Sequence, residues 1–190
     1  MSNPGESDET RFIRKCLESE DRDDLDPVPA SMKELSNVTR ISLSGQSILM
    51  IPDCIIELKA VKVEELHLSS NPLETRISGN LWKLTTLTDL HLGSCQLTSL
   101  PDAIGNLINL ETLDVQGNAL TSLPDAIGNL RRMKELYLHG NQLTEIPDAI
   151  GNLRRMKHLY LNNNQLTEIP DTLGENLLDL EDLRLYNSSL

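Results

Sequence analysis

Apolar and polar positions in the second half of the chain repeat with a period of 23 residues. Segments that start at Leu110, Met133 and Met156 read LETLDVQGNALTSLPDAIGNL, MKELYLHGNQLTEIPDAIGNL and MKHLYLNNNQLTEIPDTLGENL. Each begins with alternating apolar residues, such as Leu136 and Leu138, which predict a short strand with one buried face. Each unit is therefore predicted to be a strand, a bend and a return segment.

The strand pattern occurs seven times along the chain. The central apolar residues of the predicted strands, spaced by 23 to 25 residues, are Ile41, Leu66, Leu90, Leu113, Leu136, Leu159 and Leu183. A unit this short cannot bury its apolar side alone, so neighbouring units must stack around one continuous core. The pattern predicts a single elongated α/β domain over 28–190, in which the strands form one parallel sheet.

The N-terminal end of the repeat region has a different composition. Val28 and Pro29 match Leu123 and Pro124, so the solenoid is predicted to open with a return half-repeat near Val28. Residues 1–27 hold nine acids and four bases, which predicts a largely disordered segment. A short helix is predicted at 11–20, with an apolar side made by Phe12, Ile13, Cys16 and Leu17. Two alternatives stay open for this helix: a free, transient element or a cap over the first repeat.

The C-terminal end of the repeat region is predicted to be poorly covered. No polar capping segment follows the seventh strand, and the residues that would line this end are Leu177, Leu180, Leu183 and Leu185. Apolar solenoid ends need a cover. We expect either that the chain is a fragment of a longer protein or that this end pairs with another molecule, for example in a homodimer.

Composition excludes several classes of function. A formal net charge of -12 opposes binding to nucleic acid, because phosphate neutralisation needs Lys and Arg, and it also opposes binding to an anionic membrane. The sequence shows neither a signal-peptide core nor an apolar stretch of about 18 residues. Cys16, Cys54 and Cys95 form no C-x-x-C pair, which is typical of a reducing compartment. We expect a cytoplasmic protein.

The segment that follows each strand, L-T-x-[LI]-P-D-A-I-G-N-L, resembles the leucine-rich repeat family. It is similar in particular to the 23-residue intracellular class found in Ras-pathway scaffolds, Scribble-type polarity scaffolds and plant Ras-group-related repeat proteins. The resemblance covers residues 28–190. It implies a right-handed, horseshoe-shaped solenoid with a concave parallel sheet and short helical or 3-10 turns on the convex side, together with a scaffold or adaptor role.

The most regular polar positions have a structural explanation. Asparagines at the strand exits, Asn118, Asn141 and Asn164, are predicted to satisfy backbone groups at the bend. Prolines at the first position of each turn and glycines that permit close approach are Pro101, Pro124, Pro147, Pro170, Gly105, Gly128, Gly151 and Gly174. Two residues depart from the pattern. Cys95 replaces an asparagine as a weak hydrogen-bonding substitute, and Trp82 replaces a glycine, where we expect it to be exposed.

Side chains that point out of the sheet are the candidate partner-binding residues. They come from the third, fifth and seventh positions of the units and are Glu65, His67, Asp89, His91, Asp114, Gln116, Glu135, Tyr137, His139, His158, Tyr160, Asn162, Arg184 and Tyr186. All four histidines and all three tyrosines of the chain fall on this concave face. Tyr and His favour binding hot spots, although an exposed sheet favours aromatic residues in any case.

The concave face divides into two halves by chemistry. Glu65, Asp89 and Asp114 surround His67 and His91 in the first half, whereas the second half carries the three tyrosines. A partner protein with a basic patch and an apolar element would fit both halves. The row His67, His91 and Asp114 also has metal-ligating chemistry, but its outer members are separated by roughly 10 Å at the backbone. We therefore predict neither a metal nor another cofactor.

Catalytic motifs do not occur in the sequence. It contains neither a Gly-rich phosphate loop nor a nucleophile elbow, so an enzyme is not predicted. The main hypothesis is a non-enzymatic interaction module that binds a protein on its concave face, as a scaffold or adaptor in intracellular signalling. The alternative is the substrate-recognition part of a larger enzyme, such as a ligase or kinase, whose catalytic domain lies outside this chain.

Overall fold

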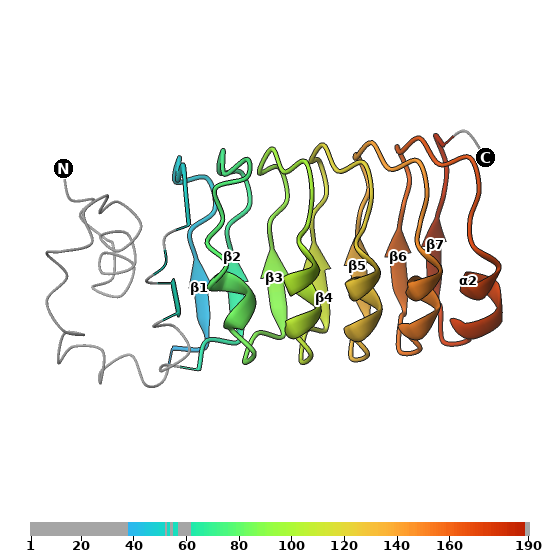
Figure 1. Cartoon of the computed structure of the whole chain (residues 1–190), viewed down its shortest axis with the longest axis horizontal. Helices are drawn as coiled ribbons and strands as arrows, with labels where there is room; N and C mark the ends of the chain where they lie inside the picture. Colours follow the sequence, from blue (N-terminus) through green and yellow to red (C-terminus); the bar gives the residue numbers. More distant parts are fainter. Residues whose placement is uncertain (1–37, 52, 54, 57–61, 189–190) are drawn as a thin grey trace, which may run out of the picture.

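Seven parallel strands, hydrogen-bonded in sequence order, form one sheet along the length of the molecule (Figure 1). The computed structural model describes residues 38–51, 53, 55–56 and 62–188. The acidic segment 1–27, the helix predicted at 11–20 and nearly all of the half-repeat that starts at Val28 lie outside the described residues. Within the described part, the predicted α/β solenoid with its parallel sheet is confirmed.

Every strand is three residues long and is followed by a return segment. The strands are β1 (Arg40–Ser42), β2 (Glu65–His67), β3 (Asp89–His91), β4 (Thr112–Asp114), β5 (Glu135–Tyr137), β6 (His158–Tyr160) and β7 (Asp182–Arg184). The convex side carries the 3-10 turns η4 (Leu81–Lys83), η5 (Asp102–Asn106), η6 (Asp125–Asn129) and η7 (Asp148–Asn152), and the helix α2 (Asp171–Asn176). None of the helices within the described residues is long and apolar enough to span a membrane.

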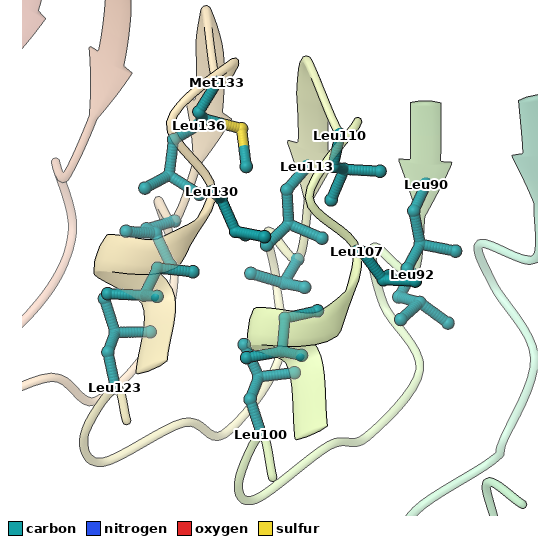
Figure 2. Packing of buried hydrophobic residues seen from close by; sticks show 14 of the residues in the cluster. Leu90, Leu92, Leu100, Leu107, Leu110, Leu113, Leu123, Leu130, Met133 and Leu136 are labelled. Carbon is teal, nitrogen blue, oxygen red and sulfur yellow. The ribbon is translucent and has the colours of Figure 1, made fainter. Parts of the chain in front are cut away.

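The core lies between the sheet and the helical turns and follows the repeat register. Central strand residues pair directly, for example Leu90 with Leu113 and Leu113 with Leu136, and all three are completely buried. Figure 2 shows these leucines packed against others from the return segments, including Leu107 and Leu130. Each fully buried aliphatic side chain contributes about 1.5 to 3 kcal/mol, so stacking units stabilise one another along the solenoid.

Buried asparagines connect neighbouring units at the bends, as predicted. The amide nitrogen of Asn118 donates to the carbonyls of Leu92 and Val115, both at 2.9 Å. Its oxygen accepts from the backbone N–H groups of Cys95 and Leu97, also at 2.9 Å. One side chain thereby satisfies four backbone groups that the strand ladder leaves unpaired. Asn71, Asn141 and Asn164 form equivalent bonds to the preceding unit.

Cys95 occupies an asparagine position and acts as the expected weak substitute. Its thiol is fully buried and lies 3.3 Å from the Leu68 carbonyl and 3.5 Å from the Gly93 carbonyl. Burial raises the pKa of the Cys95 thiol, so the thiol stays protonated and unreactive. Cys95 is therefore a structural residue.

The expectation that Trp82 is exposed is wrong. Its exposed fraction is 3% because η4 turns the indole into the apolar interior. The indole also lines a hollow of about 310 Å³ together with Ile77, Leu97 and Leu100. The second return segment has no proline, and the indole contributes to the core there, so the irregular unit remains packed.

Glycines in the convex turns allow direct contact between consecutive turns. A Cβ atom added at Gly128 would lie 2.7 Å from the carbonyl oxygen of Ala149, and one at Gly105 would lie 2.8 Å from that of Ala126. Gly174 has no such neighbour within 4 Å.

The prolines stand one residue earlier than predicted. Pro101, for example, directly precedes η5 and its carbonyl accepts the Ile104 N–H at 3.0 Å.

We predict that Gly128→Ala destabilises the chain by about 1 to 3 kcal/mol, because the new methyl group meets rigid backbone. Gly174→Ala is the matched control. The space around Gly174 is open, so the same change should be neutral or stabilising by less than about 1 kcal/mol. Urea unfolding of both variants measures the difference, and equal losses in the two would contradict close packing of the turns.

The C-terminal end is covered less completely than the middle. Leu180, Leu183 and Leu185 are half-buried against the core, and Leu178 has an exposed fraction of 83%. Leu177, which was also predicted to line this end, is instead buried beneath its own turn. The last described unit thus leaves part of its apolar side open.

Candidate functional site

The strand register places the predicted site residues in straight columns across the sheet. His67 pairs with His91, His91 with Asp114, and Tyr137 with Tyr160. A second column consists of Glu65, Asp89, Thr112, Glu135, His158 and Asp182. Because side chains alternate along a strand, both columns project from the side opposite the leucine core. We call this side the concave face.

Two of the predicted site residues are buried, although they were expected to be exposed. Asp114 has an exposed fraction of 8% and Asn162 one of 4%. Arg184 and Tyr186, at the C-terminal end, are exposed, and the other ten are half-buried. The concave face is therefore already packed against itself before any partner binds.

A hollow of about 370 Å³ brings together nine of the fourteen predicted residues. Its lining consists of His91, Asp114, Gln116, Tyr137, His139, Tyr160, Asn162, Arg184 and Tyr186. The hollow crosses the boundary between the two halves inferred from the sequence, because His91 and Asp114 line it together with the tyrosines. Glu65, His67, Asp89, Glu135 and His158 are not part of its lining.

Asp114 is held in place by Gln116, two residues later in the chain, and by the absence of a side chain at Gly93. The Gln116 backbone N–H donates to Asp114 Oδ1 at 3.0 Å, and Gln116 Nε2 donates to Oδ2 at 3.2 Å. His91 Nδ1 lies 3.5 Å from Oδ2. A Cβ atom at Gly93 would come within 3.3 Å of both carboxylate oxygens. Because Gly93 has no side chain, the Asp114 carboxylate has room beside it.

Aromatic rings and one guanidinium line the C-terminal side of the hollow. The rings of Tyr137 and Tyr160 meet edge to face, with centroids 5.1 Å apart. Arg184 lies over the Tyr160 ring at 4.0 Å and donates to Asp182 at 2.9 Å. The Tyr137 hydroxyl donates to Glu135 at 2.7 Å, and burial together with this bond raises the pKa of Tyr137. The two tyrosines therefore present rigid, uncharged rings.

A stacked histidine pair lies beside the hollow, on β2 and β3. The rings of His67 and His91 are 4.2 Å apart and nearly parallel. Glu65 forms an ion pair with Arg40, and its carboxylate lies 3.6 Å from His67 Nε2. Burial and the neighbouring His91 lower the pKa of His67, whereas Glu65 partly opposes this shift. The neutral form of His67 is thus favoured in the folded chain.

We predict that His67 makes the folded chain less stable in mild acid. Because the pKa of His67 is lowered in the folded chain, the unfolded chain binds the proton more readily. The contribution of His67 to the free energy of unfolding is therefore intact above the ordinary histidine pKa of about 6.5 and decreases as the pH falls below it. His67→Phe keeps a stacking ring without the charge. Urea unfolding between about pH 7 and pH 5 should show a steeper loss for the parent chain than for the variant. Parallel curves would contradict this assignment.

Metal binding has no geometric support among the described residues. They contain no group of three or more His, Cys, Asp and Glu side chains that could hold a metal ion. The row of His67, His91 and Asp114 does not converge, because the two imidazoles stack on each other instead.

A third hollow lies where the convex turns begin, and the sequence analysis does not predict it. It measures about 490 Å³, and its acidic lining residues are Asp125, Glu145, Asp148, Glu168 and Asp171. The sequence signal is the acidic residues beside the proline of each unit, which occur in S-L-P-D at 122–125 and in E-I-P-D at 145–148 and 168–171. Stacking units bring these acids together on one edge of the solenoid.

The fold and the sheet face define a parallel-strand solenoid with a polar concave side, and sequence comparison gives its family. The pattern described as leucine-rich repeat region matches residues 37–189, and the chain belongs to the leucine-rich repeat family. An adenylate cyclase of Schizosaccharomyces pombe is 37% identical over 92 residues. That match covers 48% of this chain and 5% of the yeast protein.

Solved structures with the same fold support the architecture. An LRR protein of Leptospira interrogans matches with a TM-score of 0.76 and 33% identity, over 86% of this chain and 41% of that one. A structure described as a TDR receptor has a TM-score of 0.63 and 32% identity, over 70% of this chain and 24% of that one. An internalin of Listeria monocytogenes, at 22% identity and a TM-score of 0.56, shares the fold over 74% of this chain and 38% of its own. The chain spans less than half the length of each.

Proposed function

We propose that this chain is a non-enzymatic interaction module that binds a partner protein on its concave face. The hollow on that face carries the proposal, because half-buried tyrosines, a buried carboxylate and an exposed arginine meet there. Rigid aromatic side chains at the centre of a concave surface are the usual energetic anchors of protein interfaces. Leucine-rich repeat domains generally bind proteins, and membership of the family supports the same role.

A scaffold or adaptor role in cytoplasmic signalling is the finer part of the proposal. It rests on the 23-residue repeat, which resembles the intracellular class of Ras-pathway and Scribble-type scaffolds. The partner would carry a basic segment and an apolar element, since carboxylates and tyrosine rings share the face. A homodimer through the half-covered C-terminal end is a separate proposal, which light scattering on the purified chain tests.

Affinity capture with the immobilised full chain, followed by mass spectrometry, tests the proposed function. Excess free chain should displace a specific partner, because it competes for the same surface. Retention of the same proteins in the presence and absence of free chain would contradict specific binding. A fluorescent fusion observed in the native cell tests the cytoplasmic location, and exclusion from the cytoplasm would contradict it.

A second candidate is the recognition part of a larger enzyme. The match to a short stretch of the yeast adenylate cyclase favours it, since similar repeats there form a small part of a protein named as an enzyme. A ligase or kinase in this role would use the concave face to select its substrate. Sequencing the native transcript across the codon for Leu190 tests this candidate. A stop codon directly after Leu190 would contradict it, and a downstream catalytic domain would support it.

A further inference from the structure

Asp114 is a buried carboxylate that forms no ion pair with a lysine or arginine among the described residues. Among the described residues, its hydrogen bonds come from the backbone and side chain of Gln116, and His91 lies 3.5 Å away. A carboxylate can accept about four hydrogen bonds, so each oxygen retains acceptor capacity. Burial of an ionised group without an opposite charge is costly. The carboxylate nevertheless lines the hollow, where an incoming cation can reach it.

Aromatic side chains flank Asp114 on both neighbouring strands. The register places His91 on β3 and Tyr137 on β5 directly beside it, and both line the same hollow. Adjacent strands are about 4.8 Å apart, so roughly 10 Å separates the backbones of the two flanking residues. His67 stacks on the β2 side of His91, and the Tyr137 hydroxyl is fixed by Glu135. His91, Asp114 and Tyr137 line the same hollow, so a planar cation that enters it can reach aromatic side chains and the carboxylate.

The molecule already contains one guanidinium held in this manner. Arg184 lies on the Tyr160 ring at 4.0 Å, and its nitrogen atoms donate to Asp182 at 2.9 and 3.1 Å. Arg184 is therefore engaged at the β7 end of the hollow, three strands from Asp114. The part of the hollow around Asp114 has the same components, an aromatic ring and a carboxylate, but no arginine.

We propose that the slot formed by His91, Asp114 and Tyr137 binds an arginine side chain of the partner protein. The inference rests on the proposed partner-binding function and names the chemistry that the concave face recognises. Arginine fits better than lysine because its planar guanidinium stacks on aromatic rings and donates two parallel hydrogen bonds to a carboxylate. The neighbouring charges of Asp89 and Glu135 attract a basic segment to the same region.

Nuclear magnetic resonance titration of the full chain with N-acetyl-argininamide tests the slot. Saturable shifts should occur at the backbone amides of Gly93, Asp114 and Gln116. Asp114→Asn keeps the size of the side chain and removes its charge, and it should weaken binding about tenfold or more. Asp102→Asn is the control, since this exposed carboxylate lies in η5 on the convex side, and it should leave affinity within about twofold. N-acetyl-lysinamide should bind more weakly than the arginine probe.

Two further variants keep the test decisive if Asp114→Asn perturbs folding. Tyr137→Phe retains the ring and should bind the probe as the parent chain does, whereas Tyr137→Ala should bind it several-fold more weakly. Absence of saturable shifts in the folded parent chain would overturn the proposal. Equal affinity of the parent chain and a folded Asp114→Asn variant would overturn it as well.

The outcome also separates this inference from the proposed function. If the arginine probe does not bind but alanine at Tyr137 and Tyr160 still prevents partner capture, the slot is wrong and the concave face remains the binding surface. If the probe binds and the tyrosine variant captures the partner unchanged, the proposed partner-binding role of the concave face is wrong.

Discussion

Replacement of Tyr137 and Tyr160 together by alanine is expected to abolish capture of the partner while the solenoid remains folded. The two rings meet edge to face at the centre of the hollow and project from the side opposite the leucine core. Truncation of a central aromatic hot spot costs about 2 to 4 kcal/mol of binding free energy. Loss of both rings should weaken binding by at least about 100-fold.

Quantitative pulldown with the captured partner measures this effect, and two controls define it. A double change of Tyr137 and Tyr160 to Phe retains both rings and should keep most of the affinity. Ile108→Ala removes an exposed apolar side chain next to η5, outside the hollow, and should leave capture unchanged. Circular dichroism checks that each variant is folded. Undiminished capture by the alanine variant would contradict the assignment of the concave face.

Asn118→Ala is expected to lower the free energy of unfolding by about 3 kcal/mol. The side chain forms five hydrogen bonds to the backbone of its own unit and the preceding one, and its exposed fraction is 8%. Each buried backbone group left without a partner costs about 1 to 3 kcal/mol, and water that enters the bend offsets part of the total. Urea unfolding monitored by circular dichroism gives the difference.

Asn106→Ala is the matched control for this prediction. Asn106 ends η5 one unit earlier and is exposed to solvent, so its replacement should change stability by less than about 0.5 kcal/mol. Similar losses of stability in both variants would contradict a specific role for the buried hydrogen bonds that Asn118 forms between units.

Much of the fold could be predicted because one physical pattern is repeated. Alternating leucines such as Leu136 and Leu138 specify a strand with one buried face, and the period of 23 residues aligns that face from unit to unit. The register of all seven strands follows from this alignment. The role of Asn118 was also predictable, because a bend after a buried strand leaves backbone groups that only a polar side chain can satisfy.

Features that depend on contacts between units could not be predicted from single positions. Trp82 was expected outside because it replaces a glycine, but the irregular second unit leaves apolar space that the indole occupies. Asp114 was expected to be exposed because it occupies the fifth position of its unit, yet Gly93, two residues after β3, leaves room for its carboxylate. The hollow crosses both chemical halves of the face because its shape follows the sizes of neighbouring side chains, and not their charges.

Hydrogen–deuterium exchange of the chain with and without its captured partner tests the central claim most directly. Peptides that span β3 to β7 are expected to exchange more slowly in the complex, with the strongest protection around Asp114, Tyr137 and Tyr160. Peptides of the convex turns η5 to η7 should be unaffected. Protection confined to the convex turns, with the concave strands unchanged, would contradict binding on the concave face.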